Sequence, residues 1–280
     1  MSIVFALLSA AVYGVGDWLG GRASRVQKSL VVATLGQTVS LVMVGAIVLV
    51  AGTSAPGVST WCWAAGGGIV GSLGIVGLYH GLAHGDVSVV APVSAVVGAA
   101  VPVVVGLASG ERPGVLAIVG IVVAVAAVAL VSGALGTHQH NTPRRIVVLS
   151  VLVGACFGSL FVALDRTDAH SGMWPLVIAR LASVPFLLIV SGATRATPVR
   201  HRGSLQIAVV AGLFDMGANL LYLVAVRGGL LAVVAVVASL YPASTVVLAL
   251  VVDKERVGKW QFTGMGAAAA ALVLVSLSRQ

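Results

Sequence analysis

Charged side chains are scarce in this sequence. Asp, Glu, Lys and Arg make up 9% of its 280 residues, whereas 59% are hydrophobic, and the mean hydropathy is +1.10. A soluble domain carries about 25% charged residues, so this composition excludes a water-exposed globular surface. The charge that is present is one-sided, with a formal net charge of +8.

Cysteines, aromatic residues and catalytic motifs are scarce as well. Cys62 and Cys156 fall in or beside apolar runs without the Cys/His spacing of a metal site, so we expect small packing residues. The low share of aromatic residues, 5%, argues against a binding cage for large aromatic cations. The sequence contains no phosphate-loop, nucleophile-elbow or zincin pattern. We therefore expect no enzymatic activity, no cofactor and no metal site.

Long apolar runs are what the sequence does contain. Runs of about 20 apolar residues between short polar breaks are typical of membrane-spanning helices, whereas a membrane barrel would alternate apolar and polar residues. The first run lacks the basic start of a signal peptide, so we expect it to remain as a helix. The sequence predicts an all-α integral membrane protein with ten transmembrane helices, at 3–19, 29–50, 62–80, 87–109, 114–133, 146–164, 173–191, 205–226, 230–252 and 260–278.

The sequence repeats itself at an offset of 144 residues. Arg22 recurs as Arg166 and Gly68 as Gly212, and Gly-Glu-Arg-Pro-Gly at 110–114 returns as Lys-Glu-Arg-Val-Gly at 254–258. We expect a first five-helix repeat at 1–135, a linker loop at 136–145 and a second repeat at 146–280. Because five is odd, two such copies enter the membrane in opposite orientations.

The basic residues of the loops predict how the chain is oriented. One set of loops, with eleven basic residues, holds Arg22, Arg25, Lys28, Arg144, Arg145, Arg195, Arg200, Arg202, Lys254, Arg256 and Lys259. The opposite set, which includes both termini, holds four, namely Arg112, Arg166, Arg227 and Arg279. Cytoplasmic loops are the ones rich in Lys and Arg, so we expect an inverted repeat with both termini outside the cytoplasm. This bias accounts for most of the net charge without a nucleic-acid partner.

Several motifs together resemble a known family. They are Tyr-Gly-Val-Gly-Asp-Trp-Leu-Gly-Gly-Arg-Ala-Ser-Arg at 13–25, Tyr-His-Gly-Leu-Ala-His-Gly-Asp at 79–86, Val-Ala-Pro-Val-Ser at 90–94 and Leu-Tyr-Pro-Ala at 240–243. With its two five-helix halves, the whole chain resembles the paired EamA domains of the drug/metabolite transporter superfamily. Pro92 and Pro102 lie in the fourth predicted helix whereas Pro242 lies in the ninth, so we expect kinks at different places in the two halves.

The resemblance implies a carrier that works by alternating access. Its central cavity would lie between the halves, lined mainly by the first, third and fourth helices together with the sixth, eighth and ninth. The polar residues of those helices are therefore the candidates for a binding site.

Asp215 is the first candidate, because an ionised carboxylate in the middle of a membrane helix costs at least about 2.5–3.5 kcal/mol. Asn219 and Tyr222 follow it at i+4 and i+7, on the same helical face. The carboxylate can contact a cation or ammonium group or accept a proton, and the alternative is a structural Asp paired with another helix. Arg180 is the second intramembrane charge; it either pairs with Asp215 or binds a substrate carboxylate.

Weaker candidates are single polar residues. Gln37, which follows Thr34 and precedes Thr38, either lines the cavity or holds two helices together. The other expected cavity-lining candidates are Tyr13, Ser72, Tyr79, Ser94, Ser239 and Tyr241. Each of them is equally explained by packing or, for Ser, by a bond to its own helix.

Residues near the predicted helix ends have structural explanations as well. Asp17 and Trp18 end the first predicted helix, where Trp anchors a helix in the interface and Asp17 is either part of that end or a gate residue. His80 and His84 are four residues apart but lack a third metal ligand. Glu111 and Glu255 start predicted helices, where a carboxylate suits the helix dipole.

These observations predict a secondary transporter that exports a small organic metabolite across the cytoplasmic membrane. A proton-coupled exporter of amino acids or cationic drugs is the alternative within transport, and a membrane scaffold or lipid-handling protein is the alternative of another class. The expected partners are a small-molecule substrate, protons in the coupled case, and the lipid bilayer, with no nucleic acid. We expect a monomer or a homodimer.

Overall fold

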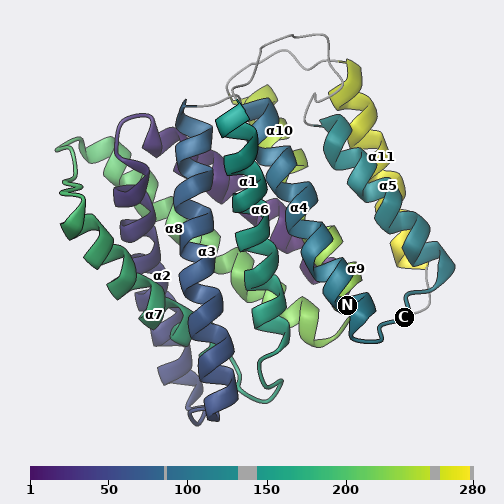
Figure 1. Cartoon of the computed structure of the whole chain (residues 1–280), viewed down its shortest axis with the longest axis horizontal. Helices are drawn as coiled ribbons and strands as arrows, with labels where there is room; N and C mark the ends of the chain where they lie inside the picture. The colour runs from purple at the N-terminus through teal and green to yellow at the C-terminus, as the bar shows by residue number, and fades with distance from the viewer. Residues whose placement is uncertain (85–86, 132–143, 253–258, 278–280) are drawn as a thin grey trace.

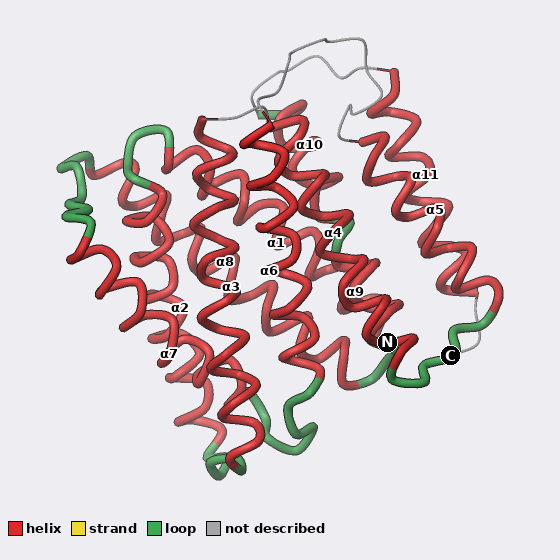
Figure 2. Tube along the Cα trace, in the orientation of Figure 1, coloured by secondary structure: helices red, strands yellow, loops and turns green. Residues whose placement is uncertain are grey.

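The computed structural model describes residues 1–84, 87–131, 144–252 and 259–277, and in these ranges it consists of helices joined by loops, without a strand (Figure 2). α1 begins and α11 ends at the same end of the bundle (Figure 1). The helices are α1 (Ser2–Ser24), α2 (Ser29–Ala51), α3 (Val58–His84), α4 (Val87–Ala108), α5 (Val115–Val131), α6 (Arg144–Asp165), α7 (Trp174–Ala193), α8 (Arg202–Arg227), α9 (Leu231–Ala238), α10 (Tyr241–Val251) and α11 (Lys259–Leu277).

The helices suit a bilayer rather than water. Six of those described, α1, α2, α3, α6, α7 and α8, are long and apolar enough to cross a membrane, and shorter apolar stretches cover Val93–Ala108, Val115–Ala127 and Leu231–Thr245. Large apolar side chains such as Leu49 and Ile189 point outward and are largely exposed. Small residues occupy the helix contacts instead, which is the usual arrangement where lipid replaces water.

The prediction of one continuous ninth helix at 230–252 is wrong. The segment divides into α9 and α10, with a turn at Ser239 and Leu240. The cause is Pro242, which has no N–H to donate and whose ring clashes with the carbonyl of the residue four positions earlier. α4, despite Pro102, is one continuous helix. The two repeat-related helices therefore differ in that one is interrupted and the other is continuous, and not by a kink in each.

Most helix contacts join α1–α5 to α6–α11, and they occur in pairs related by the 144-residue offset. α1 packs on α8 as α6 packs on α3; α2 packs on α8 as α7 packs on α3; and α1 packs on α10 as α6 packs on α4. α5 packs on its own counterpart α11 to one side of the bundle (Figure 1). The core is thus an interface between two intertwined sets of helices.

Glycine permits the closest of these crossings. A Cβ on Gly212 of α8 would collide with the backbone of Gly36 on α2, and Ser40 donates to the Gly212 carbonyl at 2.8 Å. At the repeat-related crossing of α3 with α7, a Cβ on Gly68 would collide with the backbone of Ala179. The same backbone contact is therefore built twice.

Two polar contacts, which we call clasps, join the two sets of helices at opposite ends of the bundle. In the first clasp, the Gln27 side chain donates to the carbonyl of Val199 at 2.8 Å and to Ser204 Oγ at 2.9 Å, and accepts from the Val199 N–H at 2.8 Å. In the second clasp, the Asp168 N–H donates to Thr60 Oγ1 at 3.1 Å. Thr60 and Ser204 are 144 residues apart, so they occupy equivalent positions in the two repeats. In each clasp, this position accepts a hydrogen bond from the other repeat.

Candidate functional site

A cavity lies between the two sets of helices. It spans about 560 Å³ including its open mouth, and most of its wall is apolar. A mostly apolar pocket with a few convergent polar groups is typical of small-molecule sites. The lining residues are Tyr13, Asp17, Gln37, Gly71, Ile75, Ser94, Gly98, Phe157, Leu160, Phe161, Arg180, Asp215, Asn219, Ser239 and Tyr241.

Eight of these residues form four pairs at the 144-residue offset, and the members of each pair differ in polarity. The pairs are Tyr13 with Phe157, Asp17 with Phe161, Gly71 with Asp215, and Ile75 with Asn219. The polar members belong to α1 and α8, which pack together, and the apolar members belong to α3 and α6, which also pack together. The cavity therefore has a polar wall, α1 with α8, and an apolar wall, α3 with α6.

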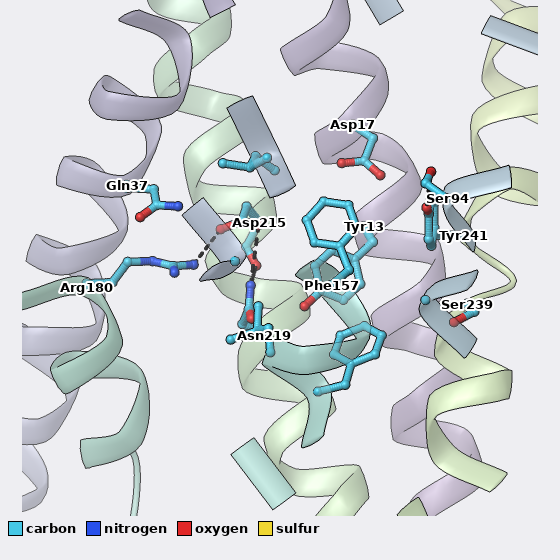
Figure 3. A pocket seen from close by; sticks show the side chains of 15 residues that line it. Tyr13, Asp17, Gln37, Ser94, Phe157, Arg180, Asp215, Asn219, Ser239 and Tyr241 are labelled. Carbon is cyan, nitrogen blue, oxygen red and sulfur yellow. Dashed lines mark hydrogen bonds and ion pairs between the residues drawn. The ribbon is translucent and has the colours of Figure 1, made fainter. Parts of the chain in front are cut away.

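Asp215 and Arg180 form an ion pair on the polar side of the cavity (Figure 3). Arg180 Nη2 lies 2.7 Å from Asp215 Oδ2, and the two side chains are only 4% and 15% exposed. Asn219 Nδ2 donates to the Asp215 backbone carbonyl at 2.8 Å and contacts Oδ1 at 3.4 Å. Of the alternatives that the sequence left open, pairing is the one present, and it balances the charge of Asp215.

Gln37 meets both descriptions that the sequence allowed. Its Oε1 accepts a hydrogen bond from Ser183, which links α2 to α7. It also lines the cavity and a smaller cleft shared with Tyr79 and Asp215. Thr34 and Thr38 donate to carbonyls of their own helix, at Leu30 and Thr34.

The prediction that Asp17 lies at a helix end is wrong. α1 continues to Ser24, and Asp17 is 7% exposed and lines the cavity. The helix continues because Gly20 lets it pack closely on α3; a Cβ there would collide with the Tyr79 ring. Within the described ranges, Asp17 has no hydrogen bond and no ion pair, which makes it different from Asp215.

The softer candidates divide into two groups. Tyr13, Ser94, Ser239 and Tyr241 line the cavity, and the Ser94 and Tyr241 hydroxyls are 3.3 Å apart. The other two, Ser72 and Tyr79, do not line it, and neither does Tyr222, which we expected to share the lining face with Asp215 and Asn219. Ser72 donates to the carbonyl of Ile69; Tyr79 packs against Gly20; and Tyr222 is fully buried, stacked on Phe161 with ring centroids 4.2 Å apart.

Residues near the helix ends serve packing and capping. The prediction that Glu111 begins the next helix is wrong, because α5 starts only at Val115. The Glu111 carboxylate instead accepts from the N–H groups of Leu231 at 2.7 Å and Ala232 at 3.0 Å, at the start of α9. The carboxylate therefore stabilises the N-terminus of α9, a helix of the other set, and not the N-terminus of α5. Glu255 lies outside the described residues.

His80 and His84 stack with ring centroids 4.6 Å apart, and Cys62 and Cys156 are free thiols. The part of the chain that the structure describes holds no group of three or more His, Cys, Asp or Glu residues suited to a metal ion.

Sequence reasoning missed the apolar half of the lining. Phe157, Leu160 and Phe161 line the cavity but look like ordinary residues of an apolar helix. The repeat offset was the signal that could have found two of them, because Phe157 and Phe161 are the counterparts of Tyr13 and Asp17.

Comparisons with known proteins agree with this architecture. The sequence profile of the EamA-like transporter family matches residues 1–133 and again residues 144–277. A crystal structure of a protein 14% identical in sequence superposes with a TM-score of 0.76, over 99% of this chain and 96% of the other, which shows a shared fold. A search of curated proteins finds no match.

Proposed function

The chain belongs to the EamA-like transporter family and is a multi-pass membrane protein, and we propose that it is a secondary active transporter that exports a small organic metabolite. In this proposal the substrate binds in the central cavity, and the two repeats move relative to each other so that the cavity opens to one side of the membrane at a time. The observation that carries the proposal is the cavity itself, which has buried charges at the interface between the two sets of helices.

The clasps support alternating access. They occupy repeat-related positions at opposite ends of the bundle, one through Ser204 and the other through Thr60. A transporter of this kind needs two gates that open in turn, and an inverted repeat provides two equivalent ones. We assign that role to the clasps.

The same proposal includes a topology. Ten membrane crossings are obtained if α9 and α10 together form one, with an inverted pair of domains at 1–135 and 146–280 joined by a linker at 136–145. We place the protein in the cytoplasmic membrane of the cell. The positive-inside bias then puts both termini outside the cytoplasm. A tag after Gln280 that is reachable only from the cytoplasm would contradict this orientation.

A scaffold is less well supported, because a scaffold has no need of a cavity lined by an ion pair and by an acid, Asp17, that has no partner among the described residues. A proton-coupled exporter is supported in part. Asp215, the coupling group that the sequence suggested, is held by Arg180, and this leaves Asp17 as the carboxylate available for coupling.

The test is counterflow in proteoliposomes with a panel of neutral, cationic, anionic and zwitterionic metabolites. We expect at least one compound to be exchanged by the wild-type protein. Leu160→Trp fills the cavity and should abolish that exchange, whereas Leu181→Trp, on an outward-facing position that is 44% exposed, should leave it unchanged. Equal exchange in the two variants would argue against the cavity as the transport site.

A further inference from the structure

We propose that the cavity binds a small organic amine, with Asp17 as the counter-ion of its ammonium group and the α3–α6 wall as the seat of its apolar part. This inference rests on the proposed transport function and names its substrate class. It follows from the charge, the hydrogen-bonding groups and the two unlike walls of the cavity.

The charges lining the cavity do not balance. Arg180 and Asp215 neutralise each other in a buried ion pair, and Asp17 is left as the third charged residue of the lining. Among the described residues, nothing pairs with it. A buried carboxylate without a partner is costly, and a bound monocation would bring the net charge of the cavity to zero. A zwitterion or a neutral molecule would leave it unbalanced.

The polar wall also has unused hydrogen-bond acceptors. In the described part of the chain, Tyr13 Oη and Asn219 Oδ1 are buried without a hydrogen-bond partner. A primary ammonium group brings three donors, which matches these two oxygens and the Asp17 carboxylate. A proton on Asp17 would cancel its charge but supply a single donor.

The packing of α1 on α8 brings these acceptors to one wall. Ser9 of α1 donates to the carbonyl of Ala218 at 2.8 Å, and further along α1 a Cβ on Gly16 would lie 3.4 Å from the Asp215 nitrogen. Tyr13 lies between these two contacts, at the level of Asp215 and Asn219. Asp17 is one helical turn from Tyr13 on the same face, and Figure 3 shows both side chains at the cavity.

The opposite wall suits an apolar group. Phe157, Leu160, Phe161 and Ile75 line it, and aromatic faces also attract cations when water is excluded. An amine with a short aryl or alkyl body would place its ammonium group on one wall and its body on the other. The wall polarity follows from the four unlike repeat pairs, so it is a property of the whole cavity rather than of one residue.

Binding to the full-length protein in lipid nanodiscs tests this inference. The probe is radiolabelled phenethylamine, with 2-phenylethanol, which lacks the ammonium group, and phenylalanine, which adds a carboxylate, as competitors. We expect saturable binding of phenethylamine and weak competition by the other two. Asp17→Asn should weaken binding about thirtyfold or more, because it removes one partner of a buried charge pair. Asp17→Glu should retain most of it.

Asp165→Asn is the matched control, because it makes the same chemical change at an acid outside the cavity, paired with Arg166 at 3.8 Å. It should bind phenethylamine as the wild type does. Unchanged binding in Asp17→Asn, or no saturable phenethylamine binding, would overturn the inference.

If counterflow of a neutral or anionic compound nevertheless persists and is blocked by Leu160→Trp, the transport function stands without the amine. If no compound of the panel is exchanged and aqueous thiol reagents do not reach Ser239→Cys, the transport function itself fails.

Discussion

Arg180 and Asp215 form an ion pair whose partners cannot be removed independently. Arg180→Gln would leave Asp215 and Asp17 as two unbalanced carboxylates in one buried cavity. Removing one partner of a buried pair costs about 3–5 kcal/mol, so we expect a loss of that order in the free energy of unfolding. Denaturant unfolding in detergent micelles measures it.

Asp215→Asn should cost less than Arg180→Gln, because Arg180 then remains in the same cavity as Asp17, an acid of opposite charge. The double variant, Arg180→Gln with Asp215→Asn, should be closer to the wild type than Arg180→Gln alone, since it leaves fewer unpaired charges. Additive losses in this cycle would mean that the two residues do not stabilise each other.

At the scale of helices, the crossing of α2 and α8 depends on Gly212. A methyl group there would collide with the backbone of Gly36, which cannot move aside as a flexible side chain can. We expect Gly212→Ala to lower the free energy of unfolding by about 1–3 kcal/mol, as overpacking does. Gly45→Ala, in α2 where a Cβ would meet nothing within 4 Å, should be neutral or slightly stabilising. Equal effects of the two substitutions would show that the crossing is not tightly packed.

The start of α9 depends on Glu111. Its carboxylate accepts from two N–H groups of the first turn, so Glu111→Ala should destabilise that turn by about 1–2 kcal/mol, as loss of a helix cap does. Hydrogen exchange of the amides at 231 and 232 should then become faster, while amides in the middle of α8 keep their protection. Unchanged exchange at 231 and 232 would contradict the cap.

The limits of sequence reasoning are visible in the same elements. Apolar length identified the helices because a bilayer demands it, yet the break between α9 and α10 required knowing that Pro242 would interrupt a buried helix. Glu111 was recognised as a helix-capping carboxylate, but which helix it caps depends on contacts between residues 120 positions apart. Asp17 was assigned to a helix end because Trp18 beside it is typical of the membrane interface, whereas α1 continues to Ser24 and packs closely on α3 through Gly20 and Gly21.

At the scale of the whole molecule, the repeat explains why the polar part of the cavity could be predicted and the apolar part could not. Asp215, Asn219 and Arg180 are unusual in a membrane helix and attract notice individually. Phe157 and Phe161 are usual there, and their role depends on facing Tyr13 and Asp17 across the pseudo-symmetric interface. Tyr222 failed as a lining residue because Phe161 stacks on it.

The two clasps offer the most direct test of alternating access. In a variant with Cys62→Ser and Cys156→Ser, cysteines are placed in the first clasp as Gln27→Cys with Ser204→Cys, or in the second as Thr60→Cys with Asp168→Cys. A short thiol cross-linker then closes either end, and counterflow is measured before and after the linker is cleaved. Closing either end alone should stop exchange, and cleavage should restore it, because each gate must open once in every cycle. Full exchange with either clasp cross-linked would contradict the account.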